Sequence, residues 1–98
     1  MTLKGKQKSY LRSMAMTMDA IFQIGKEGIG DHFVKQLDDA LEARELIKIK
    51  ILKNSAEEAK EAGESLAKEL NAELVQIIGR CIVLYRKSRK KPKIELPL

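Results

Sequence analysis

Hydrophobic and polar positions along the chain change their period several times, and each period predicts one element of structure. In three segments the apolar side chains recur every three or four residues, which is typical of helices with one buried face. Elsewhere they alternate with polar residues or form short apolar runs, which is typical of strands. In chain order the pattern predicts a helix over 4–16, a strand over 20–24, a helix over 29–44, a strand over 46–52, a helix over 55–70, and strands over 73–78 and 81–86.

Two short motifs predict how the later elements begin and turn. Asn54 or Ser55 can cap the third helix, and Ser55 and Glu58 have the spacing of a capping box. Gly79 and Arg80 form a two-residue connection with glycine first, which suits a type II′ hairpin turn. That turn would pair Ile78 with Cys81, Ile77 with Ile82, Val75 with Leu84 and Glu73 with Arg86, and would gather Val75, Ile77, Ile82 and Leu84 on one apolar face.

The order of the elements predicts an α/β fold, more closely a two-layer sandwich of the α+β type. We expect a mixed four-stranded sheet with helices covering one side and a hairpin at its end. With 98 residues and 44% hydrophobic content, the chain is long enough for a single domain over 1–98 that includes a basic segment over 86–98. We expect 86–93 to be too charged to pack, and 94–96 to dock on a sheet edge.

Charge is distributed unevenly along the chain, and this points to a polyanionic partner. Residues 1–12 hold four bases and no acid, residues 13–79 hold eight bases and thirteen acids, and residues 80–98 hold seven bases and one acid. Solubility alone does not require positive ends around an acidic middle. Charged tails are often merely solvated. The charge distribution by itself therefore fits either a solvated tail or a surface that binds a polyanion.

Catalytic and metal chemistry have little support in the sequence. Nucleophilic catalysis needs a base near a serine or cysteine, and the chain has only His32 and Cys81 as its histidine and cysteine. One histidine and one cysteine do not make a zinc site. The acids Asp38, Asp39 and Glu42 lie opposite an apolar helix stripe, where solvated carboxylates normally sit. We therefore expect neither an enzyme nor a cofactor.

Cysteine usage and hydropathy also predict where the protein is found. The lone cysteine cannot form an internal disulfide, which fits a reducing compartment. No apolar run approaches the roughly 18 residues of a membrane helix, and no long hydrophobic segment resembles a signal peptide. The sequence therefore predicts a soluble cytoplasmic protein.

The turn Gly25-Lys26-Glu27-Gly28 is the clearest candidate for a ligand contact. Glycines at both ends allow the backbone to approach a ligand closely, and the N–H groups that open the following helix can bind a phosphate. Lys26 adds a positive charge. Short turns between a strand and a helix also use glycine for backbone reasons alone, so the motif by itself leaves both interpretations open.

Five sequence blocks in order carry a family resemblance: LKGKQKSYLR (3–12), IGKEG (24–28), LEARELIKIK (41–50), VQIIGR (75–80) and LYR (84–86). Together they resemble the YhbY family, the stand-alone bacterial members of the CRM domain (chloroplast RNA splicing and ribosome maturation). The resemblance implies a fold similar to the C-terminal domain of translation initiation factor three, RNA binding without catalysis, and association with the precursor of the large ribosomal subunit. It also implies that the family's G-x-x-G loop, likened to that of KH domains, corresponds to residues 25–28.

The favoured hypothesis is a monomeric RNA-binding ribosome-assembly factor whose partner is ribosomal RNA of the large-subunit precursor. Its basic residues could form one continuous field of phosphate contacts. The same charge would serve a DNA-binding regulator, although no reading helix is recognisable, and the acidic middle would serve a protein-interaction adaptor. The candidate RNA contacts are Lys4, Lys8, Arg12, Gly25, Lys26, Glu27, Gly28, Lys48, Lys50, Arg80, Arg86, Lys87, Arg89, Lys90 and Lys91.

Overall fold

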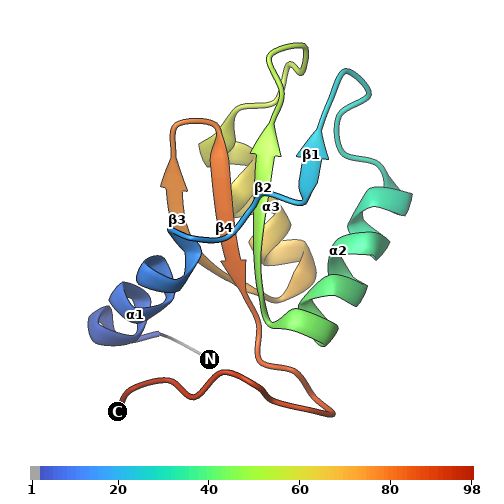
Figure 1. Cartoon of the computed structure of the whole chain (residues 1–98). Coiled ribbons are helices and arrows are strands. Elements are labelled where there is room, and N and C mark those ends of the chain that lie inside the picture. The colour runs from blue at the N-terminus through green and yellow to red at the C-terminus, as the bar shows by residue number, and fades with distance from the viewer. Residues whose placement is uncertain (1–2) are drawn as a thin grey trace.

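The computed structural model describes residues 3–98, which form three helices and a four-stranded sheet (Figure 1). Their order, α-β-α-β-α-β-β, and the mixed sheet confirm the predicted α/β fold. The elements are α1 (Gly5–Ala15), β1 (Phe22–Ile24), α2 (Asp31–Arg44), β2 (Leu46–Ile51), α3 (Ala59–Leu70), β3 (Glu73–Ile78) and β4 (Cys81–Tyr85).

The sheet has the strand order β1-β2-β4-β3. β1 and β2 are parallel because α2 connects them as a crossover, and the other neighbours are antiparallel. In β2 the side chains of Ile47, Ile49 and Ile51 are buried toward α2 and α3. Lys48 and Lys50 alternate with them and point to the opposite face, as the sequence predicts.

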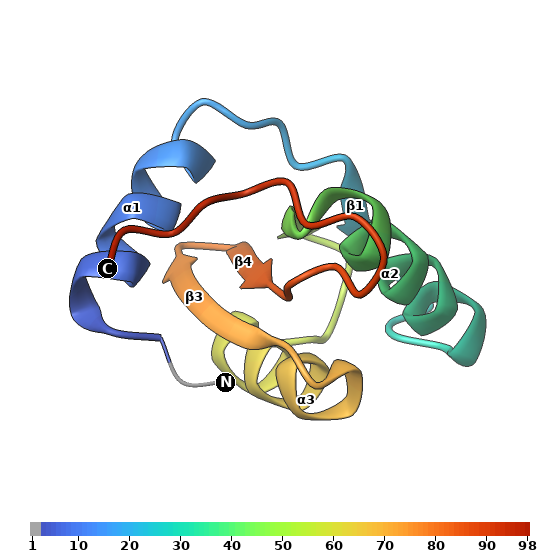
Figure 2. The same ribbon diagram turned by 90° about the horizontal axis from the view of Figure 1, so that it is seen from below.

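Helices cover both faces of the sheet, so the prediction that they cover only one side is wrong. α2 and α3 enclose a core with Ile49 and Leu84, whereas α1 encloses a second core with Val83 and Tyr85 on the opposite face. Figure 2 shows α1 and α3 on opposite sides of the strands, and the C-terminal segment passing beside α1. The physical reason is that β4 is apolar on both faces, and such a strand needs cover on both sides.

β3 contains a bulge that the sequence did not reveal. The pairs Ile78↔Cys81 and Ile77↔Ile82 are as predicted, but a register shift between Leu74 and Gln76 leaves Val75 without a partner. Leu84 pairs with Leu74 and Tyr85 with Glu73, so the predicted partners Val75 and Arg86 are wrong. The extra residue turns Val75 to the α1 face, where it joins the second core and leaves the predicted apolar face.

Several element starts also differ from the predictions, and α2 begins at Asp31 rather than at residue 29. α3 begins at Ala59 and lacks a side-chain cap, because Ser55 accepts a hydrogen bond from the N–H of Glu57 at 3.2 Å and thereby closes a local turn. β1 begins at Phe22, two residues later than expected, since only 22–24 find partners on β2. Ile21 is left 52% exposed before the strand.

Candidate nucleic-acid interface

The G-x-x-G loop connects β1 to α2 as a tight turn. The N–H of Gly28 donates to the carbonyl of Gly25 at 3.1 Å, and Gly28 has φ +73°, a left-handed conformation that favours glycine. Lys26 and Glu27 are exposed at the tip. Beside the turn is a hollow of about 500 Å³, lined by Gln23, Gly25, Lys26, Glu27, Gly28, Gly30, His32, Phe33 and Gln36. The loop and the first turn of α2 thus share one concave surface, as phosphate binding at a helix start requires.

Two further loops lie at the same end of the sheet. The N–H of Leu52 donates to the carbonyl of Ile24 at 2.9 Å, which holds the β2–α3 loop against the end of β1. The Arg80 guanidinium donates to the carbonyls of Ile51 at 3.1 Å and Leu52 at 3.2 Å, which ties the β3–β4 turn to the same loop. Figure 1 shows these loops at the same end of the sheet as the loop after β1. We call the G-x-x-G turn and the exposed cations around it the loop surface, whose cations are Lys26, Lys50, Lys53 and Arg80. Lys53 was not among the predicted contacts, although its place just after β2 could have suggested it.

Lys48 lies on the face of the sheet that the strand pattern suggested, but the end of α1 covers that part of the face and takes the lysine out of solvent. Its side chain is half-buried, and its ammonium donates to the carbonyls of Ala15 at 3.2 Å and Met18 at 3.3 Å. The Ala15 carbonyl is at the C-terminal end of α1, where a positive charge is favourable, and Met18 lies in the linker just after it. The lysine therefore holds α1 against the sheet.

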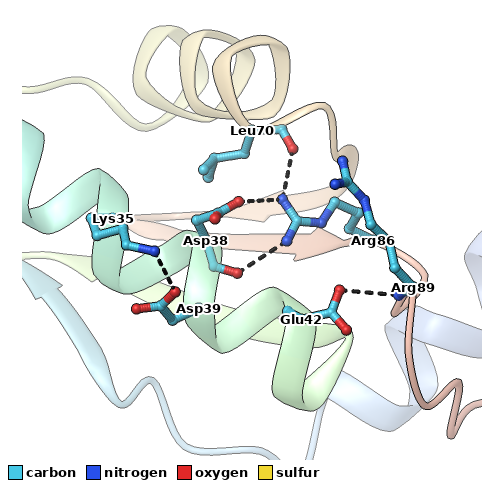
Figure 3. A network of polar contacts seen from close by, with 7 residues as sticks. All are labelled: Lys35, Asp38, Asp39, Glu42, Leu70, Arg86 and Arg89. Carbon is cyan, nitrogen blue, oxygen red and sulfur yellow. Dashed lines mark hydrogen bonds and ion pairs between the residues drawn. The ribbon is translucent and has the colours of Figure 1, made fainter.

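Arg86, another predicted phosphate contact, is engaged inside the protein. Its side chain is 14% exposed and forms an ion pair with the carboxylate of Asp38 at 2.7 Å. The guanidinium also donates to the carbonyls of Leu70 and Asp38, each at 3.0 Å (Figure 3). These contacts join the middle of α2 to the C-terminal ends of α3 and β4, so the structure places Arg86 in a supporting role.

A buried glutamate at the end of α2 fixes the C-terminal segment. Glu45 is fully buried, and its carboxylate accepts hydrogen bonds from the N–H groups of Ser88 at 2.7 Å, Lys93 at 2.6 Å and Ile94 at 2.7 Å. Burial alone would raise the pKa of Glu45, but the three donors outweigh burial and hold the pKa below its ordinary value.

Glu42, one helical turn earlier, holds the same segment from outside. Its carboxylate accepts hydrogen bonds from the Ser88 hydroxyl at 2.6 Å and from the N–H groups of Arg89 at 3.0 Å and Lys90 at 3.2 Å. These bonds, that from the Arg89 N–H foremost, lower the pKa of Glu42 to about 2. We call Glu42 and Glu45 the acidic clamp. Figure 3 shows the bond between Glu42 and Arg89.

The predictions for the C-terminal segment are therefore wrong in two respects. Although 86–93 is highly charged, Ser88 within it is only 3% exposed, because the clamp satisfies the backbone of this stretch. Ile94 and Leu96 pack into the second core beside α1 rather than along a sheet edge. The Gln7 side chain adds a hydrogen bond to the carbonyl of Pro97 at 3.1 Å.

The clamp holds the backbone and leaves the basic side chains of this segment in solvent. Within residues 3–98 the ion pairs are Lys35 with Asp39 and Arg86 with Asp38, so the exposed cations here have no acidic partner. We call them the tail surface, and they are Lys87, Arg89, Lys90, Lys91 and Lys93.

On the neighbouring α1, Lys4 is exposed, whereas Lys8 and Arg12 are half-buried. The guanidinium of Arg12 donates to the hydroxyl of Ser9 at 3.1 Å. Lys6, which was not predicted as a contact, is also exposed. α1 therefore adds positive charge beside the tail surface, although only Lys4 of its three predicted contacts is fully exposed.

His32 and Cys81, the residues considered for catalysis or metal binding, lie on different elements of the fold. His32 is exposed at the start of α2, where its Nε2 is 3.4 Å from the Gln36 amide nitrogen, and Cys81 is half-buried in β4. In the part of the chain that the structure describes, no three His, Cys, Asp or Glu side chains are grouped to hold a metal ion. No helix among residues 3–98 has the length and apolar character to cross a bilayer.

Comparison with known proteins gives consistent matches over nearly the whole chain. Residues 3–86 match the family model of the CRS1/YhbY (CRM) domain. A Bacillus subtilis protein named "Probable RNA-binding protein YqeI" is 50% identical over 95 residues, which cover 97% of this chain and 99% of that protein. A Haemophilus influenzae protein named "RNA-binding protein" is 33% identical over 96 residues, covering 98% and 96%. The solution structure of the protein SAV1595 from Staphylococcus aureus is 53% identical, with a TM-score of 0.80 over 98% of this chain and 100% of that one.

Proposed function

The chain belongs to the CRS1/YhbY (CRM) domain family, and from that premise we propose that it binds RNA through exposed cations around its G-x-x-G loop and on its clamped tail. The relatives from Bacillus subtilis and Haemophilus influenzae are named for RNA binding rather than for an enzymatic activity. Phosphate binding by lysine and arginine supplies affinity that does not depend on sequence.

One observation carries this proposal: the unpaired cations gather where the backbone is also suited to a phosphate chain. At the loop surface Gly28 has a left-handed backbone conformation that closes a tight turn. A hollow of about 500 Å³ lies between that turn and the first turn of α2. Lys26 is exposed at its rim. Only two Phe and two Tyr are present, and Phe22 and Phe33 pack against the core, so recognition rests on backbone and shape more than on stacking.

The preference for RNA over DNA is part of the proposal. α2 and α3 carry acids such as Asp39 and Glu61 on their exposed sides, which is unfavourable for a helix that reads the major groove. A titration of the protein with a structured RNA and a DNA duplex of equal length, at one salt concentration, tests this. We expect RNA to bind at least as tightly, and a clear preference for DNA would favour a DNA-binding regulator instead.

We further propose that the RNA is ribosomal, in the precursor of the large subunit, and that the protein is an assembly factor. The support is the family resemblance of the sequence blocks. Crosslinking in cells, followed by sequencing of the attached RNA, is the test. Reads concentrated on precursor ribosomal RNA are the expected result. If the protein crosslinks to proteins only, and this association resists added salt, an adaptor role replaces the proposal.

A further inference from the structure

The loop surface and the tail surface lie at opposite ends of the sheet. β1 and β2 are parallel, so the loops that follow them share one end, where Ile24 pairs with Ile51. β4 is antiparallel to β2 and ends beside its start, where the N–H of Arg86 donates to the carbonyl of Glu45 at 2.9 Å. The six residues of β2 therefore separate the two surfaces by roughly 20 Å. Figure 1 shows the loops at the top and the tail at the bottom.

The surface between these two ends is poor in exposed cations. The linker over 16–21 crosses the face of the sheet between them (Figure 1), and it contains one charged residue, Asp19. Two of its apolar side chains face solvent, with Met16 77% exposed and Ile21 52% exposed. On the other face, α2 presents Asp38 and Asp39, and the two exposed lysines of α3, Lys60 and Lys68, lie among the exposed acids Glu61, Glu64 and Glu69. The cations thus form two separate groups and not the continuous field that the sequence suggested.

The tail surface is also built for binding, because its geometry is fixed before any ligand arrives. Five backbone N–H groups and one hydroxyl of residues 88–94 donate to the acidic clamp. A free basic tail would lose conformational entropy on binding, whereas a fixed one has already lost much of it. The clamp uses backbone donors, so every cation of the tail surface stays available.

We propose that one molecule holds two separate RNA segments at once, one on the loop surface and one on the tail surface. This inference rests on the proposed RNA binding and adds a second, independent contact region to it. The acidic clamp acts as a positioning device for the second region. A protein of this kind would bring two parts of a folded RNA together without a second protein copy.

The stoichiometry with a short RNA tests the two-segment arrangement. A hairpin with a stem of about three base pairs, about 10 Å long at 3.4 Å or less per pair, does not span the roughly 20 Å between the two surfaces. Native mass spectrometry of the full chain with excess hairpin should show one protein with two hairpins. Saturation at one hairpin would overturn the inference while leaving RNA binding intact, and failure to bind this hairpin or longer structured RNAs would overturn both.

Charge-matched double variants assign each hairpin to its surface. Lys26→Glu with Lys53→Glu should remove only the hairpin at the loop surface, and Lys90→Glu with Lys91→Glu only the one at the tail surface. The control Lys60→Glu with Lys68→Glu changes two exposed lysines of α3 and should keep both hairpins. If each of the first two variants weakens both hairpins equally, or if the control does so too, the surfaces are not independent sites.

A substitution in the clamp separates positioning from charge. Glu42→Gln raises the net charge by one, so charge alone predicts tighter RNA binding. If the clamp positions the tail, the variant should instead bind RNA at the tail surface roughly three- to tenfold more weakly, because the tail must then be ordered on binding. The measurement uses the loop double variant as background, with circular dichroism to verify the fold. Unchanged or tighter binding would show that the clamp does not position the tail surface.

Discussion

At the scale of single residues, the basic tail is held by two carboxylates that do not pair with its charges. Glu42 and Glu45 accept hydrogen bonds mainly from backbone N–H groups, at distances from 2.6 to 3.2 Å. Bonds to ionised acceptors are stronger than neutral ones. A highly charged segment can therefore be ordered while its lysines remain free for an outside partner.

This arrangement predicts a dependence of stability on pH. The pKa of Glu42 is about 2 in the folded protein against an ordinary value of 4.5. Its ionised form therefore stabilises the fold fully above about pH 4.5, and this contribution is lost as the pH falls toward 2. Urea unfolding of the wild type and of Glu42→Gln across this range is the measurement. We expect the wild type to be more stable near neutral pH and the difference to shrink in acid.

Glu45 titrates in both proteins, so its effect largely cancels in that comparison. A difference between wild type and variant that stays constant from pH 6 to pH 2.5 would contradict the role assigned to the Glu42 carboxylate.

The left-handed glycine of the loop gives a second prediction at this scale. Gly28→Val should weaken RNA binding more than it weakens folding, because a β-branched residue resists φ +73° and would distort the turn where phosphate approaches. Space is not the obstacle, since a Cβ atom here would meet only the Glu57 carboxylate at 3.5 Å. Affinity is measured by titration under conditions where urea unfolding shows the variant folded.

Gly28→Asn is the matched control, because asparagine adopts left-handed backbone more readily. It should retain more of the RNA affinity than the valine variant. If both variants lose stability and affinity in proportion, the loop is only a turn.

At the scale of elements, Arg86 connects the middle of α2 to the C-terminal ends of α3 and β4. Its substitution should therefore affect stability, whereas substitution of its neighbour Lys87 should affect RNA binding. Arg86→Gln removes an ion pair at 2.7 Å and two bonds to carbonyls, and should lower the free energy of unfolding by about 2 kcal/mol. Lys87→Gln should leave stability unchanged and reduce the salt dependence of RNA binding by about one unit. Denaturant melts and salt titrations of both variants check this.

A stable Arg86→Gln protein with weakened RNA binding would contradict the supporting role and would return Arg86 to the phosphate contacts.

The differences between predicted and observed elements share one cause, which is contact between residues far apart in sequence. Periodicity predicted the helices, the strands and the β3–β4 turn because these depend on neighbours. The bulge at Val75 and the cover of both sheet faces depend on the second core, which no local pattern describes. The ordering of the tail depends on Glu42 and Glu45, more than 40 residues earlier.

The candidate RNA contacts also divide into those that local sequence predicts and those that depend on residues far apart in the chain. The G-x-x-G motif and the exposed lysines could be predicted from local sequence. Lys48 and Arg86 could not be distinguished from exposed cations, because the carbonyl groups that engage them belong to α1, α2 and α3. A single sequence does not show which acceptor groups, far apart along the chain, will lie beside a given cation in the fold.

At the scale of the whole molecule, the charge of the protein divides by region. Exposed acids gather on α2 and α3, where they outnumber the exposed lysines Lys60 and Lys68. Exposed cations without an acidic partner are concentrated at the loop surface, on α1 and at the tail surface. Such a distribution orients a polyanion toward the basic regions and away from the two acidic helices. The net charge of +5 understates this, because it averages regions of opposite sign.

The central claim is that these cations bind RNA phosphates, and the salt dependence of RNA affinity tests it most directly. The logarithm of the dissociation constant for a structured RNA is measured against the logarithm of salt concentration, for the wild type and for a variant with Lys87, Arg89, Lys90 and Lys91 changed to Glu. Exposed changes of this kind shift stability by only about half a kcal/mol each, so the variant should fold. We expect far weaker binding and a slope shallower by roughly one unit for each lost phosphate contact. A folded variant with an unchanged slope would contradict the claim for the tail, and a wild type whose RNA affinity ignores salt would contradict it for the whole molecule.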